Sequence, residues 1–316
     1  MYYPFLYGRQ SELLALRDLP SEPSIWNHIT PVIEPVNSVS GDLLRCLTKL
    51  HRLPTPVFLI TNPHHENFRR PGTIQQWRQE IDHYVTGDGA IVIPAFQVSG
   101  PSAAEQLPLF IQEFPNRPLG LVLRTRDLTS AFLLKQIRGR DVTIFVHRAA
   151  KPRSYLKELP ANQTVEVEEN FIERARNADY SGIEPFSDSL TEFKKANRPG
   201  FSDFGPLPST FKLGGGQPAA VAIHLSFADD DGDISLQHFV SDSTERGDGD
   251  RASKMSEAVA KVAAEHRDNP EKFVRSVGFR QYLDQHENAQ PTDLATSKRQ
   301  QISHHLETVA TVLSTM

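Results

Sequence analysis

Short apolar runs alternate with segments of helical apolar spacing over the first half of the chain. The apolar runs predict strands at residues 29–36, 56–63, 90–98, 119–124, 141–147 and 163–167. The intervening segments predict helices at residues 41–53, 74–85, 103–114, 128–138 and 154–159. Near-continuous apolar runs such as Pro56–Pro63 are typical of parallel strands that are buried on both faces. The alternation therefore predicts a parallel sheet whose strands are joined by crossover helices.

A closed barrel fits this pattern better than an open nucleotide-binding sheet. No predicted strand is followed by a Gly-x-Gly-x-x-Gly fingerprint or a Walker loop, which disfavours dinucleotide-binding and P-loop folds. Repeated strand-plus-helix units close at eight strands over roughly 250 residues, and this chain has 316. We therefore expect an α/β fold of the TIM-barrel-like (β/α) type.

The regular alternation ends at residue 170. Residues 170–195 are polar and predict a long excursion with a short helix or two. Asp203 is expected near the seventh strand, and the run Ala219–Phe227 is predicted to be the eighth. An Asp-rich turn with a glycine joins that run to Ile234–Val240, which is a strong hairpin signal. We expect the barrel to be irregular at strands seven and eight, with an added β-hairpin.

The C-terminal segment is predicted to be helical. Helices are expected at residues 252–265 and at residues 292–313. Between them, another helix is expected to begin at Asn269, a good cap, with Pro270 in its first turn. We expect two domains: a barrel-like α/β domain over residues 1–250 and a helical extension over residues 251–316 that packs on the barrel.

Composition narrows the class of protein. The chain has one cysteine, Cys46, so an internal disulfide and a cysteine-rich zinc site are excluded. Cys46 lies in a predicted helix. No apolar run approaches the roughly 20 residues that span a bilayer, and no secretory signal pattern is present, so we expect a cytoplasmic protein without membrane association. The net charge of −5 disfavours nucleic acid as a partner. Basic residues scattered over 117–157 nevertheless leave room for one basic face.

Polar residues at the predicted strand ends form the candidate site, because functional residues of parallel barrels lie where strands end. The candidate catalytic residues are Glu34, Asp203 and His224. The candidate substrate-binding residues are Arg124, Arg126, Asn62, Gln97 and His147.

Each charged candidate also has a structural alternative. Glu34 lies in an apolar run and needs a partner if buried, so it belongs either to a site or to a structural ion pair. Arg124 and Arg126 are two residues apart on an extended segment, where their side chains can share a face and clamp an anion. The same two arginines could instead pair structurally with Glu34 or Glu169.

The histidines divide into two groups. His64 and His65 are adjacent, and we expect their side chains to diverge toward the surface rather than to bind a metal. His224 and His238 each lie within an apolar strand, and the hairpin could bring them together. Hydrogen-bonded core histidines are the alternative. The three glycines at 214–216 have no helix after them, which indicates a lid or a close backbone approach rather than a phosphate cradle.

Several segments resemble the phage-associated Beta protein family. They are MYYPFLYGRQSELLALRDL, PVIEPV, LITNP, RARNADY, EPFSDSL and, above all, the ordered series GFSDF, AVAIHL and HFVSD. The resemblance extends from the N-terminus to about Lys254. The family-motif positions in this chain are Tyr3, Arg9, Gln10, Glu12, Glu34, Asn62, Asp179, Tyr180, Asp188, Asp203, His224, His238 and Asp242. Members commonly have Lys-Gln where this chain has Arg9-Gln10, a change that conserves charge only.

The resemblance implies a bacterial or prophage-encoded soluble protein of mobile or defence-related gene neighbourhoods, and it implies no established reaction. The residues themselves favour an enzyme acting on an anionic small molecule, a nucleotide or a phosphodiester. Arg124 and Arg126 would hold the anion, Glu34, Asp203 or Glu169 would be a base or metal ligand, and His224 would be a general acid or second ligand. Oxygen and nitrogen donors suit a divalent metal such as Mg²⁺, Mn²⁺ or Fe²⁺. The alternative is a non-catalytic immunity, sensor or toxin-neutralising module whose C-terminal helices bind a companion protein of a defence operon.

Overall fold

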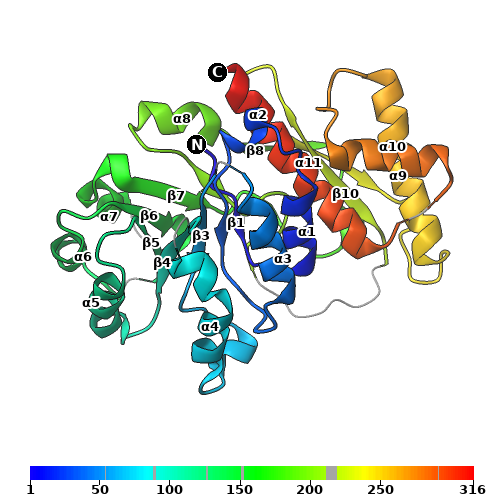
Figure 1. Cartoon of the computed structure of the whole chain (residues 1–316). Helices are drawn as coiled ribbons and strands as arrows, with labels where there is room; N and C mark the ends of the chain where they lie inside the picture. Colours follow the sequence, from blue (N-terminus) through cyan, green and yellow to red (C-terminus); the bar gives the residue numbers. More distant parts are fainter. Residues whose placement is uncertain (54, 88–89, 126, 151–152, 211–218, 291) are drawn as a thin grey trace. The chain divides into compact units, whose positions relative to one another are not determined.

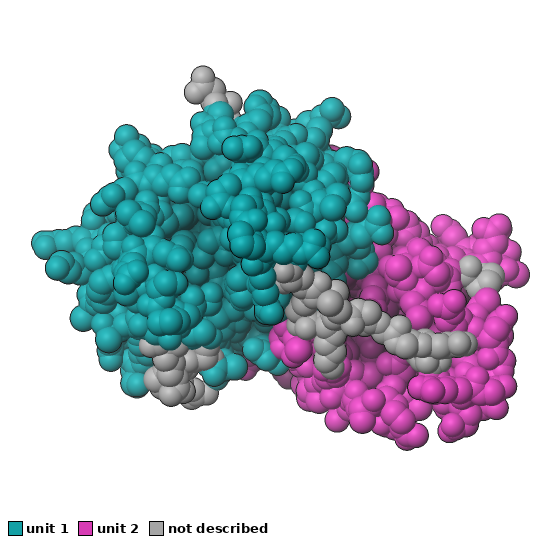
Figure 2. Space-filling model, turned by 90° about the horizontal axis from the view of Figure 1, so that it is seen from below, with its two compact units in different colours: residues 1–13, 26–169, 192–204 teal, residues 14–25, 170–191, 205–316 magenta. Residues whose placement is uncertain are grey.

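The computed structural model describes the chain as two compact units (Figure 2). The described residues are 1–53, 55–87, 90–125, 127–150, 153–210, 219–290 and 292–316. Unit 1 contains residues 1–13, 26–169 and 192–204, and unit 2 contains residues 14–25, 170–191 and 205–316. Arg126 and the glycines at 214–216 lie outside the described residues. The expected domain division at residue 250 stays a prediction.

Unit 1 holds a parallel sheet that is nearly closed into a barrel. Among the described residues, eight strands follow one another around it: β1 (Phe5–Leu6), β2 (Val32–Ile33), β3 (Val57–Ile60), β4 (Val92–Val98), β5 (Leu119–Leu123), β6 (Val142–His147), β7 (Thr164–Glu168) and β9 (Ser202–Asp203). Tyr2 forms parallel bridges both to Ile29 and to Phe201, on opposite sides. The backbone N–H of Tyr3 donates to Phe201 O at 2.9 Å. These contacts join the first strand to the last and confirm the TIM-barrel-like fold.

Aromatic rings fill the interior of this barrel. The Phe145 ring lies 5.0 Å from Phe58 and 5.4 Å from Tyr3. Phe145 lies in β6, Phe58 lies in β3 and Tyr3 comes just before β1. These strands are not neighbours in the sheet, so the three rings meet only inside it. A Cβ on Gly120 would lie 2.8 Å from both Phe58 Cδ1 and Ala95 Cβ. Glycine at this position therefore makes room for the Phe58 ring.

Helices cover the outside of the strands (Figure 1). The helices of the β/α alternation are α3 (Gly41–Leu50), α4 (Thr73–Thr86), α5 (Ala103–Glu113), α6 (Ser130–Gln136), α7 (Arg153–Glu158) and α8 (Ser189–Lys195). The N-terminal helices, α1 (Gln10–Asp18) and α2 (Pro23–Trp26), belong mostly to unit 2. Short 3-10 helices are η1 (Glu66–Arg69), η2 (Arg148–Ala150), η3 (Ala161–Gln163) and η4 (Asn177–Asp179). Cys46 is fully buried in α3, as a packed thiol would be.

Unit 2 is a small antiparallel sheet with three long helices. Its strand order is β10 (Ala222–Ala228), β11 (Ile234–Val240) and β8 (Ile183–Ser187). The helices are α9 (Arg251–Asp268), α10 (Val277–Glu287) and α11 (Leu294–Thr315). Alternate residues of β10 pack with α9, α10 and Phe273 in one apolar core, which contains Ile223, Leu225, Phe227, Met255, Val259, Val262 and Phe279.

Helix α11 covers the outer edge of β10 with polar side chains. Gln301 Oε1 accepts the backbone N–H of His224 at 2.9 Å, and His304 Nε2 donates to Ser226 O at 2.8 Å. An open strand edge leaves unpaired backbone groups, and these two side chains satisfy them. This role explains why a helix with so many polar residues is buried along most of its length.

Two expectations about the elements are wrong. The run at 219–227 is not a barrel strand, because Phe5–Leu6 completes the barrel and β10 belongs to the separate sheet. Asn269 does not start a helix; its N–H donates to Glu265 O at the end of α9, and α10 begins after Ser276. The excursion after residue 170 has the expected short helices, η4 and α8, and it also contains a strand that the sequence pattern did not predict, β8. None of the described helices is long and apolar enough to cross a bilayer.

Candidate functional site

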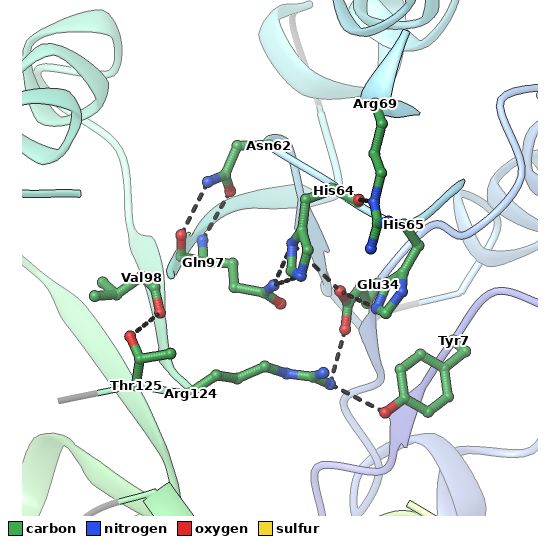
Figure 3. A network of polar contacts seen from close by, with 10 residues as sticks. All are labelled: Tyr7, Glu34, Asn62, His64, His65, Arg69, Gln97, Val98, Arg124 and Thr125. Atoms are coloured by element: carbon green, nitrogen blue, oxygen red, sulfur yellow. Dashed lines mark hydrogen bonds and ion pairs between the residues drawn. The ribbon is translucent and has the colours of Figure 1, made fainter. Parts of the chain in front are cut away.

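A buried ion pair lies at the carboxyl ends of the barrel strands. Glu34 follows β2, is fully buried, and its Oε2 lies 2.8 Å from Nη2 of Arg124, which follows β5. β2 and β5 are not neighbours in the sheet, so the pair reaches across the end of the barrel. Figure 3 shows Glu34 between Arg124 on one side and two histidines on the other. This is the end at which parallel barrels carry their functional groups.

The two histidines after β3 turn toward Glu34. His65 Nε2 lies 3.0 Å from Glu34 Oε1, and His64 Nδ1 lies 4.0 Å from the same oxygen. The two imidazole rings stack, with centroids 4.8 Å apart and planes at 23°. The expectation that these side chains diverge is wrong, because both imidazoles face Oε1 of Glu34, although His65 itself has extended backbone dihedrals just before the 3-10 helix η1.

Asn62 and Gln97 hold His64 in place. Asn62 accepts the backbone N–H of Gln97 at 2.7 Å and donates to its carbonyl at 2.9 Å, which ties the end of β4 to the loop after β3. The Gln97 side chain then donates from Nε2 to His64 Nδ1 at 2.6 Å. Gln97 Oε1 is buried without a hydrogen-bond partner among the described residues. A buried acceptor of this kind is costly unless a ligand or water satisfies it.

Aromatic side chains of the N-terminal strand hold Arg124. Its guanidinium carbon lies 5.1 Å from the Phe5 ring centroid and 5.4 Å from that of Tyr7, and Nη2 donates to the Tyr7 hydroxyl at 3.3 Å. His147, the last residue of β6, packs edge-on against Phe5 with centroids 5.1 Å apart. Burial, reinforced by the charge of Arg124, holds the pKa of His147 well below its usual value, so this imidazole is neutral.

The carboxylate of Glu34 stays ionised in spite of its burial. Burial alone would raise its pKa, but the hydrogen bond from His65 and the positive charge of Arg124 outweigh burial and lower the pKa overall. Burial also lowers the pKa of His64, which favours the neutral imidazole at physiological pH. One carboxylate and one guanidinium therefore balance each other beside an uncharged His64.

Asp203 lies in the seam of the barrel, which is the region around Tyr2, Phe201 and Asp203 where the first strand meets the last. It is the last residue of β9, it is buried, and its Oδ1 accepts the Tyr2 hydroxyl at 2.6 Å. The Tyr2 ring stacks on Phe201 at 5.1 Å. The Tyr2–Asp203 contact thus belongs to the network that closes the sheet. The expected Arg124–Arg126 clamp falls on a residue outside the described ranges, and Arg124 instead contacts Glu34 and Tyr7.

His224 forms a second polar cluster, within unit 2. His224 and His238 are directly opposed on β10 and β11, and their Nδ1 atoms lie 2.7 Å apart, which confirms that the hairpin brings them together. His238 Nε2 lies 3.2 Å from Glu184 Oε1, and Glu184 Oε2 lies 2.9 Å from Arg174 Nη2. Since a carboxylate only accepts, His238 carries its proton on Nε2 and His224 donates from Nδ1.

This chain of contacts keeps His224 uncharged. Burial, and then the neighbouring His238, lower the pKa of His224 to about 3. The Tyr180 ring covers both imidazoles, with centroids 4.6 Å from His224 and 5.1 Å from His238. His224 belongs to unit 2, whereas Glu34 and Arg124 belong to unit 1. The three predicted catalytic residues thus lie in three different places: Glu34 pairs with Arg124, Asp203 with Tyr2, and His224 with His238.

Sequence reasoning missed Tyr7, Glu184 and the role of the two adjacent histidines. The position of His64 and His65 directly after an apolar strand was the available signal for the histidines. Within the described part of the chain, Glu34, His64 and His65 form a group of potential metal ligands whose donor atoms all lie within 4.8 Å of one another. Comparisons with protein-family models, with curated proteins and with solved structures gave no match.

Proposed function

We propose that the barrel of unit 1 is an enzyme acting on a small anionic molecule, with a phosphoester such as a nucleotide or phosphodiester as the substrate class. The observation that carries the proposal is the convergence of Glu34, Arg124 and His65 at the carboxyl ends of the strands. An ionised carboxylate, a guanidinium and an imidazole together supply the groups that bind an anion and move a proton.

Arg124 is the anion-binding group of this proposal. Its Nε is buried and has no hydrogen-bond partner among the described residues. A phosphoester oxygen would satisfy this donor, since guanidinium matches the geometry of phosphate oxygens. The Phe5 and Tyr7 rings hold the guanidinium in a fixed position, so little conformational freedom is lost on binding.

Glu34 and His65 are the proton-accepting pair. In hydrolysis, the oxygen of a water molecule forms a bond to phosphorus while the ester P–O bond breaks. The Glu34–His65 pair takes the proton of that water, and the released alkoxide takes a proton from solvent. His147 remains neutral, and its Nε2, which has no hydrogen-bond partner among the described residues, is available to an uncharged part of the substrate.

The resemblance to the phage-associated Beta protein family supports a setting in a bacterial or phage conflict system. In that setting the alternative function is a non-catalytic immunity or sensor module with a companion protein from the same defence operon. The alternative keeps Arg124 as an anion-binding group but gives Glu34 a purely structural role. Catalytic turnover of a phosphoester is expected for the enzyme and not for the immunity or sensor module.

Activity on bis(4-nitrophenyl) phosphate and on a set of nucleotide phosphoesters tests the proposal. We expect turnover in the wild type and a loss of about 100-fold or more in Glu34→Gln and Arg124→Met. Arg148→Gln is the matched control, because Arg148 forms a 2.8 Å ion pair with Glu168 next to another strand end but lies outside the Glu34 cluster. Wild-type turnover in both site variants, with circular dichroism unchanged, would refute the assignment. Anion binding without turnover would favour the sensor alternative.

A further inference from the structure

We propose that Glu34, His64 and His65 form a binding site for one divalent transition metal of the Zn²⁺ or Fe²⁺ type. The proposal deepens the function of the same site and rests on it for its purpose, although metal binding is measured independently of turnover. The ligands would be one carboxylate oxygen and two imidazole nitrogens, contributed by the segments that follow β2 and β3.

The donor atoms are close to the spacing that a metal requires. Zinc–nitrogen and zinc–oxygen bonds of roughly 2.0–2.2 Å place neighbouring ligand atoms about 3.0–3.5 Å apart. The separation of Glu34 Oε1 and His65 Nε2, 3.0 Å, is already within that range, and that of Glu34 Oε1 and His64 Nδ1 is 4.0 Å. The His64 side chain is 42% exposed, so its ring has room for the small movement needed.

The two oxygens of Glu34 have separate partners. Oε2 contacts Arg124, whereas both imidazoles face Oε1. A metal at Oε1 therefore leaves the ion pair with Arg124 in place. Only a proton shared between His65 and the carboxylate has to leave, which metal ligation requires in any case.

The local charge gives the metal a function. Without a metal, the Glu34 carboxylate lies 2.8 Å from the Arg124 guanidinium and offsets its positive charge, so the cluster has little attraction for an anionic substrate. A divalent ion adds two positive charges next to the guanidinium. In a buried site such charges attract anions strongly, and the ion also lowers the pKa of a bound water molecule.

The donor set selects among the metals. Two imidazoles with one carboxylate are typical of zinc sites and of non-haem iron sites. Mg²⁺ prefers an octahedral shell of oxygen atoms. Among the ions expected from the sequence, this set of two nitrogen donors and one oxygen donor therefore favours Fe²⁺ and disfavours Mg²⁺. Zn²⁺ joins the candidates because of the imidazoles.

Gln97 provides the supporting contact that metal-bound histidines usually have. Its Nε2 lies 2.6 Å from His64 Nδ1 and 3.3 Å from His64 Nε2. When a metal takes Nδ1, rotation of the Gln97 amide brings Oε1 toward the N–H at Nε2. This rotation pairs the buried oxygen, which otherwise has no hydrogen-bond partner among the described residues, and fixes the tautomer of the ligand.

Cobalt absorption and elemental analysis test the site in the full chain. We expect the chelator-treated wild type to bind about one Co²⁺ per chain with visible d–d bands, and Zn²⁺ to displace it. His64→Ala and Glu34→Gln should each weaken binding by at least about tenfold, and Gln97→Leu by roughly 10–100-fold. His83→Ala, an exposed histidine on α4, is the control and should bind like the wild type.

The outcomes separate this proposal from the proposed function. Unchanged cobalt spectra in His64→Ala, which removes a partly exposed side chain and should fold normally, would overturn the metal site. Phosphoester turnover at full rate in metal-free protein would overturn the role of the metal in substrate binding and catalysis while leaving the enzyme assignment intact. Metal binding that depends on His64 and Glu34, without any phosphoester turnover, would support the site and refute the substrate class.

Discussion

Gly278 is the residue at which a single methyl group should disturb unit 2 most clearly. It lies in the first turn of α10, where a Cβ would overlap the carbonyl oxygen of Gln300 and lie 2.9 Å from its carbonyl carbon and 2.7 Å from Ser303 Oγ. Real Cβ atoms do not approach other heavy atoms this closely. The carbonyl is part of the α11 backbone and cannot rotate away, so Gly278→Ala has to push α10 away from α11.

The structure sets the size of the effect. Phe279 and Tyr282 on α10 are fully buried, and the Tyr282 hydroxyl donates to Ser297 O at 2.9 Å. A shift of α10 therefore loosens the packing of both rings and weakens this hydrogen bond. Overpacking of a well-packed interface costs about 1–3 kcal/mol, against which alanine gains at most about 1 kcal/mol of helix propensity. We expect a net loss of about 2 kcal/mol, or roughly 5 °C in Tm for a unit of this size.

Urea unfolding followed by circular dichroism measures this loss. Gly247→Ala is the matched control, because a Cβ there meets nothing within 4 Å, and it should change stability by less than about 0.5 kcal/mol. A Gly278→Ala variant as stable as the wild type would show that α10 and α11 do not approach through this glycine. The same result would refute the packing described for unit 2.

Three further predictions concern buried polar groups. The pKa of His224 is lowered to about 3, so the folded state binds fewer protons than the unfolded one. The free energy of unfolding should fall by up to about 4 kcal/mol as the pH drops from about 6.5 toward 3. When urea midpoints are measured over this pH range, they should change less with pH in His224→Asn than in the wild type. Burial raises the pKa of Glu307 to about 7, so this side chain stabilises the folded state at low pH. The stabilisation, up to about 3 kcal/mol, is lost as the pH rises from about 4.5 to 7. Glu307→Gln should remove this dependence of stability on pH, and an unchanged dependence would contradict the prediction. Tyr2→Phe leaves the buried Asp203 without its 2.6 Å donor and should cost about 1–3 kcal/mol in the same unfolding assay, whereas a neutral result would mean that the seam does not depend on this bond.

Apolar patterning located most of the barrel, because parallel strands buried on both faces leave continuous runs such as Val92–Val98 and Val142–His147. It failed for β1 and β9, since two-residue strands have no periodicity to detect. The missing first strand led to the assignment of 219–227 as the eighth. The candidate site followed the same rule: Glu34, Arg124 and Gln97 were found because they end strands.

Partners contributed by irregular segments could not be predicted in this way. His65 and Tyr7 reach the site from loops, and their orientation depends on where the chain turns after β3 and β1. The same limit applies to α11, where Gln301 and His304 are buried because they complete the hydrogen bonding of β10 and not because of any helical periodicity. A buried polar side chain is thus explained only by the group it satisfies. Gln97 Oε1, Arg124 Nε and His147 Nε2 are buried at the carboxyl ends of the barrel strands with no such group among the described residues, and this shared lack of hydrogen-bond partners is the strongest physical reason to propose a bound ligand at that end of the barrel.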